Sequence, residues 1–108
     1  MDAREKRIAQ NEALFREVNE RVREVTDRFG QLSDAEFVCE CGYQSCTERI
    51  RVRLEEYEAV RKSPTYFLVK PGHEIPDVET VIEHHDTFVV VAKHTVAAEI
   101  AVETDPRR

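Results

Sequence analysis

The feature that most restricts how this 108-residue chain can fold is a cluster of thiols. Its three cysteines, Cys39, Cys41 and Cys46, all lie in the segment FVCECGYQSC. Thiolates held close together repel one another, whereas a bound metal ion neutralises them and turns its binding energy into folding energy. We interpret the C-x-C-x4-C spacing as a metal-binding turn, with Zn²⁺ as the expected ion. Gly42, directly after the second cysteine, is expected to adopt a left-handed backbone that points peptide N–H groups at a sulfur.

A structural zinc site needs four ligands, so a fourth side chain must come from another part of the chain. The available histidines are His73, His84, His85 and His94. We predict His73, because the turn pair Pro71-Gly72 precedes it and would present it at the end of the apolar segment YFLV. A ligand at this position would tie the C-terminal half of the chain to the cysteines.

Other interpretations are compatible with the same cysteines. They could pack as small apolar side chains, or bind an iron–sulfur cluster, although a fourth cysteine is missing. An open fourth position on a metal would carry a water for hydrolysis, with Glu74 or Glu40 as its base. The sequence contains no H-E-x-x-H motif, no nucleophile-elbow serine and only three glycines, so we expect a protein without catalytic activity.

The overall charge indicates which partners are disfavoured, and the first residues indicate the compartment. A formal net charge of −6 disfavours non-specific binding to nucleic acids and to anionic membranes. Arg49, Arg51 and Arg53 form a basic stripe on a predicted strand, which we interpret as a solvated face balanced by acidic neighbours. Met1 is followed by DAREKR rather than by an apolar signal region, so we expect a cytoplasmic protein. Cytoplasmic thiols stay reduced, which favours metal ligands over disulfides.

The first thirty residues predict one long helix. Residues 2–29 contain no glycine or proline, and Gly30 follows as a candidate C-terminal cap. The apolar residues recur at heptad spacing, with Asn11 in one of the positions: Ile8, Phe15, Val18, Val22, Val25 and Phe29. A helix of about 42 Å would exceed a body about 30 Å across. It therefore either covers one face of the following sheet, or offers Phe15, Val18, Val22 and Val25 to a protein partner or a second copy.

The rest of the chain predicts short strands and helices. The segments EFVCEC, RIRVRL and TYFLVK read as strands, EEYEAVRK as a short helix, and residues 78–94 as a β-hairpin. The segment VAAEIAVET is either a helix or a strand. We predict an α+β fold in which residues 1–30 form the long amphipathic helix. Residues 31–108 form a small zinc-binding body with a mostly antiparallel sheet, and the two parts make one compact unit.

Four segments, NEALFREVNERV, FVCECGYQSC, EYEAVR and FLVKPGHE, resemble a group of small uncharacterised proteins from actinobacteria. The resemblance covers most of the chain. It implies a bacterial cytoplasmic protein in which the cysteines and His73 belong to one motif, and it implies no particular activity.

Together these features predict a non-catalytic, zinc-stabilised adaptor or regulator that binds a protein through its N-terminal helix. A redox or metal sensor is an alternative, because exposed zinc-bound thiolates react with oxidants. A zinc-dependent hydrolase is a third interpretation.

Overall fold

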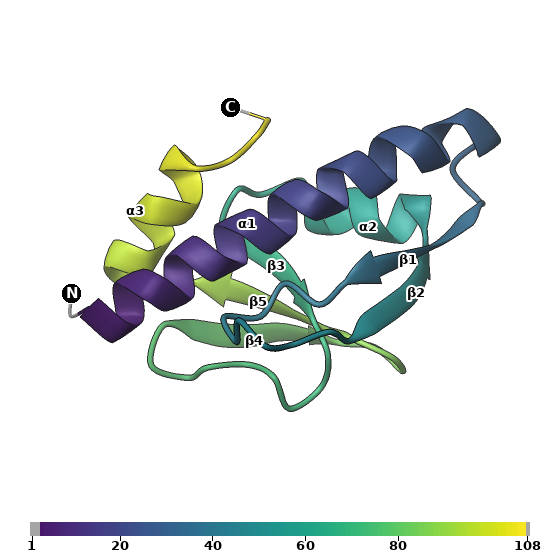
Figure 1. Cartoon of the computed structure of the whole chain (residues 1–108). Helices are drawn as coiled ribbons and strands as arrows, with labels where there is room; N and C mark the ends of the chain where they lie inside the picture. Colours follow the sequence, from purple (N-terminus) through teal and green to yellow (C-terminus); the bar gives the residue numbers. More distant parts are fainter. Residues whose placement is uncertain (1–2, 108) are drawn as a thin grey trace.

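The structure is a computed structural model that describes residues 3–107. Its helices are α1 (Ala3–Thr26), the 3-10 turn η1 (Asp27–Phe29), α2 (Leu54–Val60) and α3 (Thr95–Glu103). One antiparallel sheet pairs β1 (Asp34–Val38) with β2 (Arg49–Arg53), and the other has the strand order β3 (Tyr66–Val69), β5 (Val89–Lys93), β4 (Glu79–His84) (Figure 1). The predicted α+β class is confirmed, with the predicted single sheet divided in two.

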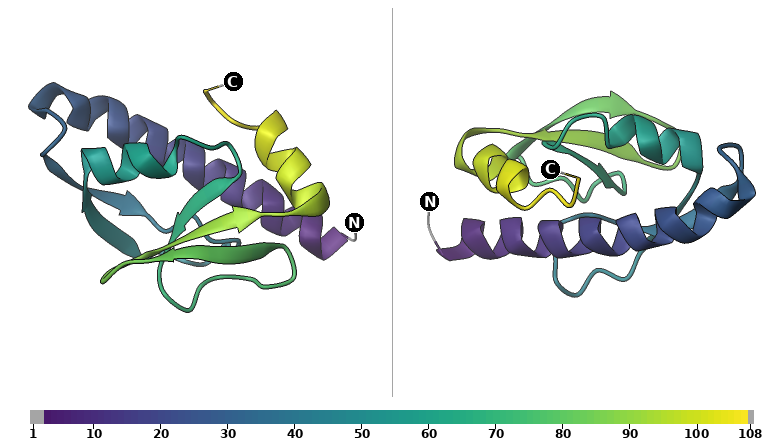
Figure 2. Two further views of the ribbon diagram at one scale, coloured as in Figure 1. Left: turned by 180° about the vertical axis from the view of Figure 1, so that it is seen from behind. Right: turned by 90° about the horizontal axis from the view of Figure 1, so that it is seen from above.

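The long helix is confirmed from Ala3 onward, and residue 2 lies outside the described part of the chain. Its 24 residues span about 36 Å and run along the longest dimension of a molecule measuring 42 × 28 × 24 Å (Figure 1, Figure 2). The helix tightens into η1 and stops at Gly30, whose φ of +94° suits a glycine cap. Because buried residues occur from Ile8 to Thr26, α1 packs on the body along most of its length rather than projecting from it.

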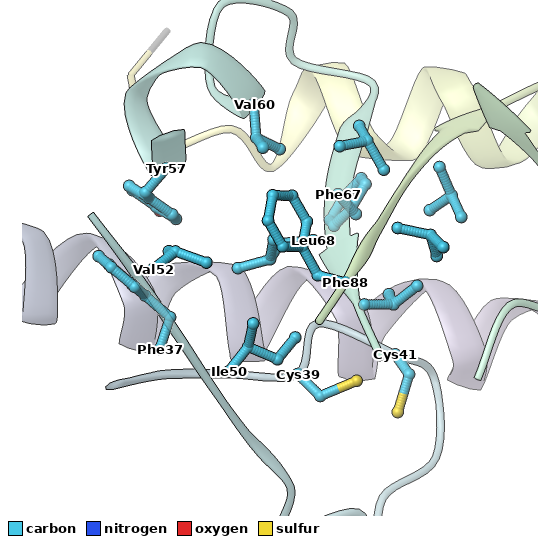
Figure 3. Close-up of a cluster of buried hydrophobic side chains, with 14 of the residues drawn as sticks. Phe37, Cys39, Cys41, Ile50, Val52, Tyr57, Val60, Phe67, Leu68 and Phe88 are labelled. Atoms are coloured by element: carbon cyan, nitrogen blue, oxygen red, sulfur yellow. The ribbon is translucent and has the colours of Figure 1, made fainter. Parts of the chain in front are cut away.

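The main core lies between the strands, α1 and α2. Phe37 of β1 stacks on Tyr57 of α2 with ring centroids 4.3 Å apart, and alternate residues Ile50 and Val52 of β2 point inward (Figure 3). Apolar side chains of β3 and β5 complete the cluster from the other sheet. Burial of this apolar surface, at about 25 cal/mol per Å², is the main stabilising term for the body.

The buried side of α1 is largely polar, which the heptad pattern did not predict. Its centre consists of the inner face, which we define as Glu12, Arg16, Asn19 and Glu20. Each of these side chains reaches polar groups contributed by distant segments of the chain. Charged side chains are stable in an interior only when they are paired or hydrogen-bonded.

Arg16 illustrates how completely the inner face is enclosed. Its guanidinium donates to the backbone oxygens of Pro64 at 2.5 Å and Ala101 at 2.7 Å, and lies 4.5 Å from the centre of the Phe67 ring. These contacts join α1 to the C-terminal end of α3 and to the loop before β3, as Figure 2 shows for the elements themselves. The aromatic face and the two carbonyl acceptors offset only part of its desolvation, because burial still lowers the pKa of the Arg16 guanidinium.

Two further ion-pair groups flank Arg16. Toward the N-terminus, Lys93 of β5 contacts both Glu12 and Glu79, and all three side chains are buried. Toward the C-terminus, Glu20 accepts a hydrogen bond from the Tyr57 hydroxyl at 2.7 Å and pairs with Arg61 at 3.6 Å. Because these partners come from far along the chain, the position of the helix is determined by long-range charge pairing.

The opposite side of α1 exposes apolar side chains. We call the following set the outer stripe: Leu14, Val18, Val25, Phe29 and Leu32. Phe29 is 74% exposed and Leu14 is 58% exposed. Of the residues predicted to bind a partner, Val18 and Val25 are exposed, whereas Phe15 and Val22 are partly buried and Val22 packs on the core. The four residues predicted to bind a partner are therefore divided between the exposed side and the partly buried side of the helix.

The shorter elements follow the predicted order. β2 alternates as predicted, with its arginines outside, and Arg51 lies 3.7 Å from Asp34 and 3.9 Å from Glu36. This agrees with the prediction of a basic face balanced by acidic neighbours. β1 ends at Val38, one residue before the first cysteine, and VAAEIAVET forms a helix.

Candidate metal centre

The three cysteines and His73 converge at the edge of the core. Cys39 and Cys41 follow directly after β1, Cys46 lies in the loop before β2, and His73 follows β3. One potential ligand atom from each of the four residues lies within 4.8 Å of the other three. Figure 3 shows the sulfur atoms of Cys39 and Cys41 on the same side of the chain. These four residues could hold a metal ion.

The distances fit a tetrahedral ion. His73 Nδ1 lies 3.6 Å from the sulfur of Cys39 and 3.6 Å from that of Cys46. In a tetrahedral site with metal–sulfur bonds of about 2.3 Å, neighbouring ligand atoms are about 3.8 Å apart. Small side-chain movements therefore bring all four atoms onto one ion.

The turn that presents His73 has the geometry that Pro71-Gly72 predicts. The His73 N–H donates to the Lys70 oxygen at 3.0 Å, and Gly72 has φ of +90°. These are the features of a type II turn, in which proline precedes a glycine with positive φ. The Lys70 N–H also donates to the Cys39 sulfur at 3.2 Å, which stabilises a thiolate there.

The thiols influence one another's ionisation. A hydrogen bond from the Cys39 thiol, followed by bonds from the Tyr43 backbone and from His73, lowers the pKa of Cys41 to about 5 against the opposing effect of burial. The same Cys39–Cys41 hydrogen bond, together with burial, raises the pKa of Cys39, and burial raises that of Cys46. A thiolate at Cys41 is the form that binds a metal ion.

Gly42 has a different role from the one expected. Positive φ angles among the glycines occur at Gly30 and Gly72, so the predicted left-handed backbone at Gly42 is wrong. Gly42 is buried under α1, where an added Cβ would overlap Ile8 and lie 3.2 Å from Ile75. Its oxygen accepts a hydrogen bond from the Asn11 side chain at 3.1 Å. The glycine is needed because the cysteine loop and α1 approach each other closely.

The other side chains considered as ligands or bases are placed elsewhere. His84 and His85 are exposed at the β4–β5 turn, and His94 precedes α3. The Glu74 carboxylate accepts a hydrogen bond from the Gly72 N–H at 2.9 Å. Glu40 is fully buried, and its two oxygens accept hydrogen bonds from Leu68 and Asn19. Sequence reasoning missed this role of Asn19, which no local pattern could reveal.

The two surface depressions with volumes of about 390 and 450 Å³ lie apart from these ligands. One is bordered by α1 and the C-terminal segment, and the other by β2 and the β4–β5 turn. Both are lined mainly by charged or polar exposed side chains, which is not the apolar enclosure typical of a small-molecule site.

Comparison with known proteins found no matching family model, no matching curated protein and no matching solved structure. Within residues 3–107, no helix has an apolar stretch long enough to cross a lipid bilayer.

Proposed function

We propose that this chain is a non-catalytic, cytoplasmic protein-interaction module, an adaptor or regulator, whose body is stabilised by one zinc ion. The observation that carries the proposal is the complete set of four ligands, Cys39, Cys41, Cys46 and His73. Structural zinc sites are closed by four protein ligands, whereas catalytic sites keep a position for water. The metal joins the loop after β1 to the turn after β3, and so links the two sheets.

Zinc is the preferred ion because of the donor set. Three thiolates with one imidazole, spaced for a tetrahedron, suit zinc better than the oxygen-binding ions. Iron–sulfur clusters are usually held by four cysteines, and this chain has three. Reduced thiols, which the site requires, are the normal state in the cytoplasm.

The surroundings of the site favour a structural role over hydrolysis. A zinc-bound water needs a nearby base. Both oxygens of Glu40 are turned into the core, and Glu74 bonds within its own turn. The Glu40 carboxylate is therefore not available to a water on the metal, and the hydrogen bond within the turn orients Glu74 toward its own backbone.

The interaction surface in this proposal is the outer stripe of α1. It suits an apolar helix of a partner protein that carries charges of both signs, because Arg21, Glu24 and Arg28 border the stripe on the exposed surface. Mixed signs complement neither nucleic acid nor an anionic membrane. Three of these exposed apolar side chains lie on α1 and the other two follow it, and a group of such side chains is typical of interaction sites.

The metal part of the proposal is tested by elemental analysis of the purified protein beside Cys41→Ser and His73→Ala. We expect about one zinc per chain in the wild type and loss of zinc in both variants. Cobalt substitution should give the visible spectrum of a closed tetrahedral thiolate site. An exchangeable water on the cobalt ion would favour hydrolysis instead, and absence of metal would leave three free thiols and contradict the proposal.

The interaction part is tested with the double variant Val18→Asp/Val25→Asp. Both side chains are exposed, so we expect stability to change by less than about 0.5 kcal/mol per site while partner binding is lost. Light scattering distinguishes a second copy from a different protein as the occupant. Val22→Asp, which alters the core instead, is the matched control and should destabilise the fold. A double variant that retains every partner and the wild-type oligomeric state would show that the stripe has no docking role.

A sensor is a second candidate, because Cys46 and His73 are only half-buried. Peroxide would oxidise two metal-bound thiolates to a disulfide and be reduced to water, with release of zinc. Zinc release at peroxide concentrations that leave a buried-zinc control protein intact would support the sensor. Retention of zinc at those concentrations would exclude it.

A further inference from the structure

Glu40 occupies the middle of the C-x-C sequence but faces away from the metal site. The sulfur atoms of Cys39 and Cys41 belong to the ligand cluster, whereas the Glu40 carboxylate bonds to groups of α1 and β3 in the core. Its carboxylate is 0% exposed and accepts a hydrogen bond from the Leu68 N–H at 2.9 Å and another from the Asn19 amide at 2.8 Å. A buried carboxylate is destabilising unless such donors satisfy it.

Asn19 of α1 connects the same carboxylate to the end of β1. Its Nδ2 donates to the Val38 oxygen at 2.8 Å as well as to Glu40, and its Oδ1 accepts from the Val38 N–H at 2.8 Å. The Asn19 side chain therefore pairs with Val38 as a neighbouring strand residue would. This fixes the backbone one residue before the first cysteine.

Glu40 also joins the cysteine loop to the strand that leads to His73. Its own N–H donates to the Leu68 oxygen at 2.8 Å, while the Leu68 N–H donates to its carboxylate. Two residues later, the Lys70 N–H reaches the Cys39 sulfur, and the type II turn then presents His73. The segment with Cys39 and Cys41 and the segment with His73 are thus held in one register by Glu40.

We propose that Glu40 and Asn19 are the positioning residues of the metal site: together they hold the C-x-C loop against β3, so that the ligands are in place before the ion arrives. The inference rests on the proposed zinc function. Residues behind the ligands of a metal site typically change metal affinity by 10- to 100-fold when they are replaced. A glutamine at position 40 keeps the shape but offers one acceptor oxygen to two donors, and it turns an NH₂ group toward one of them.

The test measures zinc affinity by competition with a chromophoric chelator, together with the visible spectrum of the cobalt-substituted protein. We expect Glu40→Gln and Asn19→Ala each to weaken zinc binding by about 10- to 100-fold and to alter the cobalt spectrum. Because the two residues act as a pair, the double variant should lose less than the product of the two single losses.

Lys93→Met is the matched control. Lys93 is another buried charged residue, but it contacts Glu12 and Glu79 rather than Glu40 or the cysteine loop. It should destabilise the fold and leave the cobalt spectrum unchanged. A purely structural role of Glu40 would make its variants behave like this control.

Wild-type zinc affinity and an unchanged cobalt spectrum in folded Glu40→Gln and Asn19→Ala would overturn the inference while leaving the zinc site intact. Failure of both variants to fold in excess zinc would also overturn it, since the pair would then determine folding rather than position ligands. A wild-type protein that binds no zinc would refute the proposed function itself.

Discussion

The inner face of α1 and the metal centre hold distant segments together by different physical means. On the inner face, Lys93 of β5 lies between Glu12 and Glu79, and burial keeps Glu12 protonated, so that Lys93 balances Glu79. Glu20 meets Arg61, which follows α2, so these opposite charges compensate within the protein. At the metal centre the groups that converge are three thiols and an imidazole, and neighbouring thiolates repel one another. Such a group requires a metal ion from outside to be stable as an assembly of thiolates.

Because the two regions are held together differently, we expect them to respond to different changes in conditions. Ion pairs on the inner face form whenever the chain folds, and they respond to the environment mainly through pH. In the proposed function, the metal centre would respond to metal supply and to oxidants, because thiolate ligands are reactive and Cys46 and His73 are only half-buried. The two regions meet where Gly42 packs against Ile8 and where Asn19 bonds to Glu40, so the loop that carries the cysteines is in direct contact with α1.

Removal of the metal should have the largest effect. Structural zinc contributes about 10–16 kcal/mol of apparent binding energy in small zinc domains at pH 7. In the proposed function, part of that energy would stabilise the fold, and we expect a chelator or Cys41→Ser to lower the free energy of unfolding by several kcal/mol. Thermal melts with and without chelator measure this. Equal melting temperatures in both conditions would mean that the ligand cluster does not contribute to folding.

Lys93→Met should have the next largest effect, because it removes the only cation seen between the buried carboxylates Glu12 and Glu79 within residues 3–107. Breaking a buried ion pair by removing one partner typically costs about 3–5 kcal/mol. Urea unfolding at constant zinc measures the loss. Lys62→Met, at an exposed position, is the matched control and should be nearly neutral. If Lys93→Met lowered the free energy of unfolding no more than Lys62→Met does, the contacts of Lys93 with the buried carboxylates would not contribute to stability.

Gly42→Ala tests the contact between the two regions. The new methyl group would overlap Ile8, and overpacking of this kind typically costs about 1–3 kcal/mol. The second change Ile8→Ala opens space at the same point, so the double variant should lose less stability than the sum of the two single variants. Strict additivity in urea unfolding would contradict the close packing of the cysteine loop against α1.

Glu12→Gln should have the smallest effect when stability is measured at acidic pH. Burial raises the pKa of Glu12 from 4.5 to about 9 in spite of the attraction to Lys93, so the folded protein keeps a proton that the unfolded chain has lost. The contribution of Glu12 to stability is therefore present below pH 4.5 and falls as the pH rises toward 9, by at most about 1.4 kcal/mol per pH unit. Glutamine imitates the protonated acid, so the variant should change stability by less than about 1 kcal/mol below pH 4.5 and should become more stable than the wild type as the pH rises toward 9.

Urea unfolding of the wild type and of Glu12→Gln between pH 5 and pH 9 isolates the contribution of Glu12, because the two proteins share every other ionisable residue. The difference in stability between variant and wild type should move in favour of Glu12→Gln as the pH rises. A difference that stays constant, or moves in favour of the wild type, would mean that Glu12 is ionised in the fold.

The sequence by itself determined the local structure and the candidate ligand set. The spacing of apolar residues predicted α1, β2, α2 and the β4–β5 hairpin, because each of these patterns follows from the geometry of a single element. The cysteine spacing and the Pro71-Gly72 turn predicted the four residues that the fold brings together. These features could be predicted because each depends only on residues that are close together in the sequence.

Only the tertiary structure decided which side of α1 is buried. Heptad spacing placed Val18 and Val25 in a seam, but the fold buries Arg16 and Glu20 and leaves those valines exposed. The burial of a charged residue depends on its partner, and the partners of α1 lie up to 88 residues away. The roles of Gly42 and Glu40 likewise depend on what packs against them. Such pairings are set by the folded arrangement of distant segments, and no local period in a sequence encodes them.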